Sequence, residues 1–239
     1  MWQQLPDTGG LKSMNKIEDA FKNKKAFIPF VTAGDPSLDV TRELILAMQE
    51  AGADLIEIGI PFSDPVAEGP VIQEADDRAL SAGVTTDKIF DMVDDIADKI
   101  HVPIVFMTYI NPIYVYGVEK FAKRAKACGA AGVIVPDVPF EEKEEIRGSF
   151  EAEGLVVISM VAPTSADRVR MIAKEAKGFL YCVSSLGVTG VRTEIGTAIG
   201  DLIQTVKEEC SIPCAIGFGI STPEQAEAMA KISDGAIVG

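Results

Sequence analysis

Short apolar segments rich in β-branched and aromatic residues recur eight times along the chain, separated by stretches with helical spacing. These segments are FIPFV from Phe27, LIEIG from Leu55, PIVFMT from Pro103, GVIV from Gly132, LVVIS from Leu155, FLYCV from Phe179, PCAIG from Pro213 and GAIV from Gly235. Strands that are apolar on both faces and alternate with helices are typical of parallel sheets covered by helices. A doubly wound sheet and a closed barrel both satisfy this pattern, and eight units favour the (β/α)₈ barrel.

The stretches between these segments carry apolar residues near i, i+3, i+4 and i+7, the spacing of an amphipathic helix. Local signals mark several helix ends. Thr222 is a predicted N-cap, followed by Pro223 and by Gln225 in capping-box register, and Ser37 precedes the first long helix. Glycines follow four predicted helices where C-caps are expected, at Gly52, Gly129, Gly154 and Gly178.

The chain length of 239 residues suits one α/β barrel. Residues 1–13 are polar and turn-rich, so we expect a disordered tag remnant or a misplaced start there, and a single barrel domain over residues 14–239. The sequence ends at Gly239, directly after the eighth predicted strand. The barrel is therefore expected to lack its final helix, as a C-terminally truncated protein would.

The composition excludes several classes of function. A formal net charge of -14 would repel nucleic acid and anionic membrane surfaces. The four cysteines form no C-x-x-C pair and the chain has one His, so no metal site and reduced, cytoplasmic thiols are expected. The longest run without Asp, Glu, Lys or Arg, residues 100–118, contains Pro103, Pro112 and Gly117, which predicts a strand followed by a loop and no membrane span.

Glu57 is the most informative single residue, because apolar neighbours surround it in the second predicted strand. A carboxyl group buried there has a raised pKa, which suits a proton donor or acceptor near neutral pH. The carboxyl ends of barrel strands are where such groups act. A Glu held by a structural partner is the alternative.

Further acids follow the ends of predicted strands. Asp64 and Glu68 lie in PFSDPVAEGP after the second strand, and Asp137 lies in VPDVP after the fourth. All three can share the barrel mouth with Glu57. Asp64 and Asp137 are also typical of Asx turns, and Glu68 of a solvated helix start, so a structural role remains open for each.

Two glycine motifs occupy positions suited to an anion. SSLGVTG, from Ser184 to Gly190, follows the sixth strand, and GFGIS, from Gly217 to Ser221, follows the seventh. Glycines let backbone N–H groups approach a phosphate, and the loops after strands seven and eight form the usual phosphate site of such barrels. Ordinary turns are the alternative for each motif taken singly. Tyr181, within the sixth strand, is either a core residue or a substrate contact.

Taken together, the segments FIPFVTAGDPS, LIEIGIPFSDPVAEGPVIQ, VPDVPFEE, APTS, SSLGVTG and GFGIS resemble the tryptophan synthase α subunit, over about residues 15–239. The resemblance implies a carbon–carbon lyase of tryptophan biosynthesis that cleaves indole-3-glycerol phosphate to indole and glyceraldehyde 3-phosphate by a retro-aldol reaction. It implies that Glu57 shuttles a proton at indole C3 and that a second carboxylate assists at the indole N–H. That second carboxylate is usually Asp, and this chain has Glu68 there.

The resemblance also assigns the other site residues. Phe30 and Tyr181 would lie against the indole, with Thr189 closing on the site from the loop after the sixth strand. Asp64 and Asp137 would organise loops at the interface between subunits. Backbone groups would contact the phosphate at Gly190, Gly219 and Gly239.

The partner implied is the tryptophan synthase β subunit, in an αββα complex. This subunit needs no cofactor of its own, and pyridoxal phosphate belongs to the partner. Three alternatives stay open: a stand-alone indole-releasing lyase, a non-catalytic regulatory subunit and another phosphosugar barrel such as an isomerase.

Overall fold

The eight apolar segments form eight parallel strands in the computed structural model, which describes residues 17–184 and 192–239. Neighbouring strands pair in sequence order, and the last pairs with the first, so the sheet closes into a barrel. All eight predicted strands and the predicted barrel are thereby confirmed. The strands are β1 (Ala26–Thr32), β2 (Ile56–Gly59), β3 (Ile104–Met107), β4 (Gly132–Ile134), β5 (Val156–Val161), β6 (Leu180–Val183), β7 (Cys214–Gly217) and β8 (Gly235–Val238).

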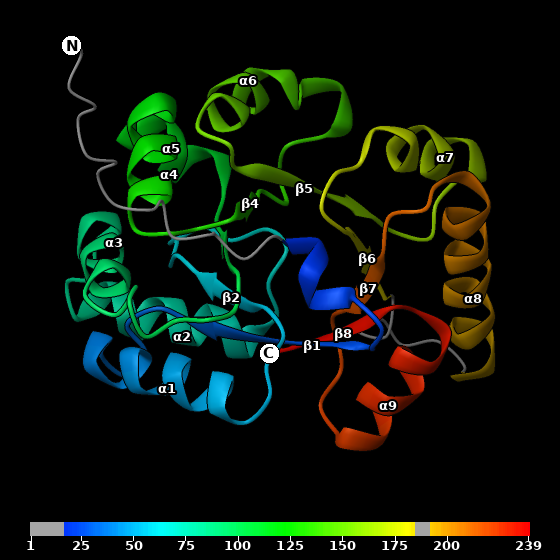
Figure 1. Ribbon diagram of the computed structural model, residues 1–239, viewed down its shortest axis with the longest axis horizontal. Helices are drawn as coiled ribbons and strands as arrows, with labels where there is room; N and C mark the ends of the chain where they lie inside the picture. The colour runs from blue at the N-terminus through cyan, green and yellow to red at the C-terminus, as the bar shows by residue number, and fades with distance from the viewer. Residues whose placement is uncertain (1–16, 185–191) are drawn as a thin grey trace, which may run out of the picture.

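Helices form the layer around the barrel, as Figure 1 shows. Two faces of each strand therefore meet apolar side chains, one set inside the barrel and one set beneath the helices. The helices are α1 (Leu38–Glu50), α2 (Pro70–Ser81), α3 (Thr86–Asp94), α4 (Ile110–Tyr116), α5 (Val118–Ala127), α6 (Glu144–Ala152), α7 (Ala166–Glu175), α8 (Arg192–Glu209) and α9 (Pro223–Ile232). Short 3₁₀ helices are η1 (Ile17–Phe21) and η2 (Phe140–Glu142).

Two helix starts follow the predicted capping chemistry. The side chain of Ser37 accepts from the N–H of Val40 at α1, and that of Thr222 accepts from the N–H of Gln225 at α9. The structure adds α2, which begins at Pro70 and packs against β1. This helix directly follows the loop that contains Asp64 and Glu68, and it holds the C-terminal end of that loop in place.

The prediction of a loop after the third strand is wrong, because residues 110–116 form the helix α4. Its first N–H, at Ile110, donates to Oδ1 of Asp137 from the loop after β4, at 3.0 Å. Ile113 is buried against the outer core. A segment without charges and with a central proline becomes helical here because a distant acid satisfies its N-terminus and burial stabilises one face.

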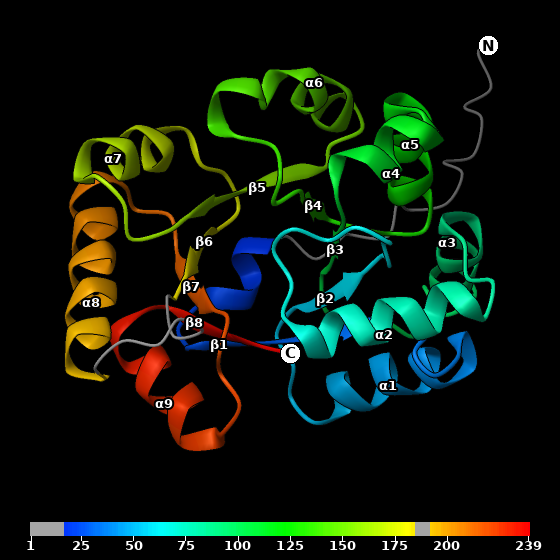
Figure 2. The ribbon, with the colours of Figure 1, turned by 180° about the vertical axis from the view of Figure 1, so that it is seen from behind.

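The 3₁₀ helix η1 closes the amino end of the barrel, and both views place it across the barrel centre (Figures 1 and 2). Ile17 and Ala20 are buried. The ring of Phe21 lies 5.5 Å from that of Phe179, which precedes β6. With this end filled by apolar side chains, the carboxyl ends of the strands remain as the place for a site.

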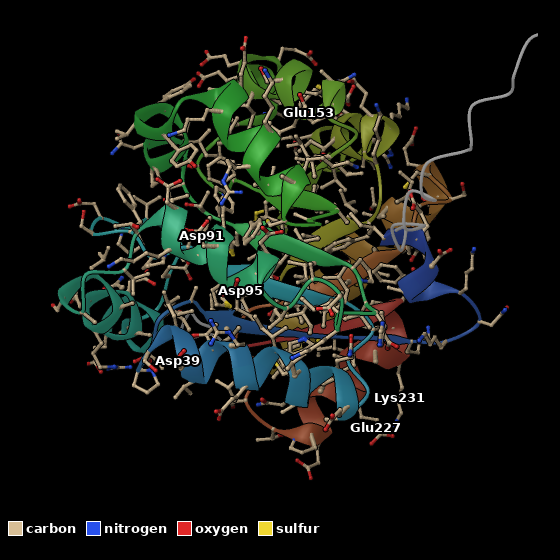
Figure 3. All side chains as sticks on the ribbon, turned by 60° about the vertical axis from the view of Figure 1, so that its left-hand side comes forward. Asp39, Asp91, Asp95, Glu153, Glu227 and Lys231 are labelled. Carbon is tan, nitrogen blue, oxygen red and sulfur yellow. The ribbon has the colours of Figure 1, made fainter. Side chains whose placement is uncertain are left out.

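Several charged side chains lie on outward helix faces (Figure 3). The labelled Asp39, Asp91, Glu227 and Lys231 in Figure 3 belong to α1, α3 and α9. Asp39 pairs with Arg42 at 2.8 Å, and Glu227 pairs with Lys231 at 2.7 Å. These are solvated surface pairs that contribute little stability individually. In the part of the chain that the structure describes, no helix combines the length and apolarity needed to cross a bilayer.

Candidate active site

Glu57 lies in the middle of β2 and points into the barrel between apolar neighbours. Its register partners are Phe30 on β1 and Val105 on β3. Its side chain is 1% exposed, and neither carboxyl oxygen has a hydrogen-bond partner among the described residues. Burial, and after it the charge of Glu68, raises the pKa of Glu57 to about 8. At neutral pH this carboxyl group therefore holds its proton and can donate it.

Glu68 lies in the loop between β2 and α2 and is half-buried. Its Oε1 accepts a hydrogen bond from the Oη of Tyr109 at 3.0 Å, and its backbone carbonyl accepts one from Nε2 of Gln73 at 2.8 Å. Burial raises the pKa of Glu68, and the hydrogen bond from Tyr109 opposes that rise. Glu68 thus lies at a helix start, directly before the N-cap Gly69 of α2, but it is half-buried and its carboxylate is bound by a buried phenol.

Tyr181 lies on β6, across the barrel from β2, the strand that carries Glu57. It is buried in the inner core cluster. Burial, followed by the charges of Glu57 and Glu68, raises its pKa well above the usual range. A Cβ at Gly217 would lie only 2.2 Å from the Tyr181 Oη, so the neighbouring strand β7 accommodates this hydroxyl group only because glycine stands there.

Phe30 lies on β1, the strand that pairs with β2. A Cβ at Gly59 would lie 2.6 Å from Cζ of its ring, and a Cβ at Gly239 would lie 3.3 Å from its Cδ1. The end of β8 therefore meets the same mouth as β1 and β2. Phe30 on β1, Glu57 on β2, Tyr181 on β6 and Gly239 just after β8 lie toward this mouth, as expected of a site at the carboxyl end of a barrel.

The loop after β7 has an unusual backbone. Phe218 and Gly219 both have positive φ, 75° and 70°. Such a conformation is rare for a phenylalanine and marks local strain. The carbonyl of Phe218 accepts a hydrogen bond from the Oγ of Ser184 at 2.5 Å, and its ring lies 6.0 Å from that of Tyr181. Gly219 therefore follows a residue with strained backbone whose ring packs against Tyr181.

The structure places the two remaining predicted acids away from the carboxyl pair. Asp64 is exposed and accepts from the Oγ of Ser63 at 2.5 Å. Asp137 is bound to the first N–H of α4 and links two neighbouring loops. Both positions suit loop organisation better than proton transfer. Thr189 and Gly190 lie outside the described residues, as do residues 1–13.

Sequence reasoning missed Tyr109 and Asp76. Tyr109 follows β3 in phase with Val105 and Met107, an alternation that could have placed it inside the barrel. Asp76 is an acid on the buried face of α2, where burial raises its pKa to about 7. Within residues 17–184 and 192–239, no three His, Cys, Asp or Glu side chains are grouped to hold a metal ion.

Comparison with known proteins identifies the family. The family model described as tryptophan synthase alpha chain matches residues 17–239. The tryptophan synthase alpha chain of Lacticaseibacillus casei is 48% identical over 226 residues, 95% of this chain and 85% of that one. That of Halalkalibacterium halodurans is 49% identical over 228 residues, 95% of this chain and 86% of that one.

Solved structures agree with the sequence relatives. Tryptophan synthase subunit alpha from Legionella pneumophila has a TM-score of 0.85 at 38% identity, and the match covers 95% of this chain and 87% of that one. The α subunit from Campylobacter jejuni also has a TM-score of 0.85, at 33% identity over 92% of this chain and 88% of that one. The barrel, its buried glutamate and these matches make the chain a member of the tryptophan synthase α-chain family.

Proposed function

We propose that Glu57 and Glu68 carry the lyase reaction of this family in this chain. A tryptophan synthase α chain is a carbon–carbon lyase that cleaves indole-3-glycerol phosphate to indole and glyceraldehyde 3-phosphate in tryptophan biosynthesis. The observation that carries the proposal is the buried carboxyl group of Glu57, which has no hydrogen-bond partner among the described residues and stays protonated near neutral pH beside the charge of Glu68.

The two carboxyl groups divide the proton transfers. Protonated Glu57 donates to indole C3, while the Glu68 carboxylate accepts or stabilises the indole N–H proton, which gives an indolenine. The Glu57 carboxylate then takes the proton of the adjacent glycerol hydroxyl group. The carbon–carbon bond breaks, its electron pair restores the indole ring, and the nitrogen regains its proton from Glu68. Both side chains end in their starting states.

Substrate positioning falls to the residues around this pair. Phe30 and Tyr181 are proposed to contact the indole from β1 and β6, where each ring lies close to a glycine of the next strand, Gly59 and Gly217. Gly219 and Gly239, at the ends of β7 and β8, would offer backbone N–H groups to the phosphate. Thr189 and Gly190 complete the proposal from the loop after β6.

The proposed partner is the tryptophan synthase β subunit, in an αββα complex in the cytoplasm. Apolar side chains protrude from segments next to the loops of Asp64 and Asp137: Val66 is 79% exposed, Val115 is 82% exposed, and Val71 and Tyr114 are exposed as well. Such side chains suit the core of an interface. The α subunit itself would use no cofactor, and pyridoxal phosphate would belong to the partner.

The test is indole release from indole-3-glycerol phosphate by the full chain, alone and with a β subunit, with Glu57→Gln as the control. Glu57-dependent release that the β subunit accelerates is the expected result. High activity of the isolated chain without acceleration would favour the stand-alone lyase. A folded, partner-bound chain that releases no indole would contradict the proposal and favour a regulatory subunit.

A further inference from the structure

Tyr109 is buried just after the carboxyl end of β3, and its hydroxyl group contacts the side chain of Glu68. Its phenol makes two hydrogen bonds to one loop. The N–H of Ala67 donates to the Tyr109 Oη at 3.0 Å, and this Oη donates to Oε1 of Glu68, also at 3.0 Å. Because a backbone N–H can only donate, it occupies an acceptor site of the phenol and leaves the single phenol proton for Glu68.

The phenol is held rigidly in this position. Its ring packs 5.4 Å from that of Phe62, in the same loop. The backbone N–H of Phe62 is in turn bound by the carboxyl group of Asp76 on α2. The loop is therefore fixed at both sides of Glu68, by α2 and by the residue that follows β3. A rigid donor aimed at a carboxylate stabilises the ionised form more than the neutral form.

The two proposed catalytic carboxyl groups thus differ in one respect that the fold imposes. Glu57 has no hydrogen-bond donor within the described residues, whereas Glu68 has a dedicated one. We propose that Tyr109 is a positioning residue that holds Glu68 as an ionised, fixed acceptor, so that Glu68 serves as the base while the unpartnered Glu57 serves as the acid. This inference rests on the proposed function, because it assigns roles within the same reaction.

The titratable groups that face Glu68 come from several elements. They are Glu57 on β2, Asp76 on α2, Tyr109 after β3 and Tyr181 on β6. All of them carry negative charge or none, so none offsets the charge of Glu68. Among the described interactions, the hydrogen bond from Tyr109 is the one that favours the ionised form of Glu68. Loss of this hydrogen bond therefore raises the pKa of Glu68.

Tyr109→Phe removes the donated proton and keeps the ring against Phe62. Tyr116→Phe is the matched control, because Tyr116 donates its phenol proton to Asp87 on the outer surface. For Tyr109→Phe we expect kcat to fall on the acid limb of its pH profile, by up to about tenfold for a shift of one pKa unit, with KM nearly unchanged. The acid limb of the kcat profile should move to higher pH by a similar step, and the profile of Tyr116→Phe should match that of the unmodified chain.

A readout independent of turnover separates this inference from the proposed function. Carbon-13 NMR of chain labelled at the glutamate carboxyl groups, with Glu68→Gln to identify the resonance, measures the titration of Glu68 directly. We expect its pKa to rise in Tyr109→Phe and to stay constant in Tyr116→Phe. If the unmodified complex released no indole, the proposed function would fail while this titration still tested Tyr109.

A second variant keeps the proposal testable if Tyr109→Phe does not fold. Incorporation of 3-fluorotyrosine at position 109 keeps the ring and oxygen but makes the phenol a stronger donor, so the pKa of Glu68 and the acid limb should both move to lower pH. An unchanged Glu68 titration in either folded variant, together with an unchanged pH profile, would overturn the proposal.

Discussion

Phe30 on β1 lies directly opposite Glu57 on β2, so the residue paired with the buried carboxyl group is an aromatic ring that offers no hydrogen-bond donor. The ring reaches over Gly59, where an added Cβ would lie 2.6 Å from its Cζ. A buried acid with an apolar partner keeps its proton to higher pH than one in water. Burial of Glu57 beside an apolar ring therefore costs folding free energy, and the same burial keeps the carboxyl group protonated so that it can donate a proton.

Replacement of Glu57 with Gln tests that role. The amide keeps the shape of the side chain but cannot exchange a proton, so cleavage should fall by about 10³-fold while the fold is retained. Indole release and far-ultraviolet circular dichroism measure the two quantities. A folded Glu57→Gln protein with undiminished cleavage would rule out the mechanism.

The same variant changes how stability depends on pH. The pKa of Glu57 is raised from 4.5 to about 8 on folding, so between these values the folded state binds the proton that the unfolded state has released. Glu57 therefore lowers the free energy of unfolding as pH rises, by up to about 1.4 kcal/mol per pH unit. Urea unfolding of both proteins between pH 5 and pH 8 should show a stability advantage of Glu57→Gln that grows with pH, and a constant difference would contradict the buried acid.

Glu68 can be tested with two replacements of different kind. Glu68→Gln removes the carboxylate, and we expect cleavage to fall by roughly 10²-fold or more. Glu68→Asp keeps the carboxylate but withdraws it by one methylene from the Tyr109 hydroxyl group, so cleavage should persist at about a tenth of its level. Steady-state assays of both variants measure whether Glu68→Asp retains more cleavage than Glu68→Gln. Equal loss in the two would mean that the length of the side chain, and not its charge, limits the reaction.

Gly217 is a test of the packing behind Tyr181. In Gly217→Ala the new methyl group would overlap the Tyr181 hydroxyl group, which should raise KM and destabilise the chain by about 1–3 kcal/mol. Gly148→Ala on α6 is the matched control, because nothing lies within 4 Å of its added Cβ and alanine favours helices. Thermal unfolding and substrate titration distinguish the two; a neutral Gly217→Ala would mean that Tyr181 moves freely.

Local patterns explain what could be predicted. The apolar neighbours of Glu57 in the second predicted strand predicted a buried acid, and the structure buries it. Ser37 and Thr222 predicted the starts of the helices that they cap. These features need only neighbours within a few residues along the chain, so the residues themselves contain the information.

Tertiary structure alone decided the rest. The helix α4 exists because Asp137, 27 positions away, accepts the N–H of Ile110. The placement of Glu68 depends on Tyr109, 41 positions away, and the shape of the Tyr181 pocket depends on a glycine in the neighbouring strand. The sequence by itself determined the strands, the barrel class and the acid in the second strand, because periodicity and apolar runs are local. Which donor meets which carboxylate was settled only when barrel closure brought distant loops together, because a hydrogen bond depends on distance and direction that no spacing in the chain encodes.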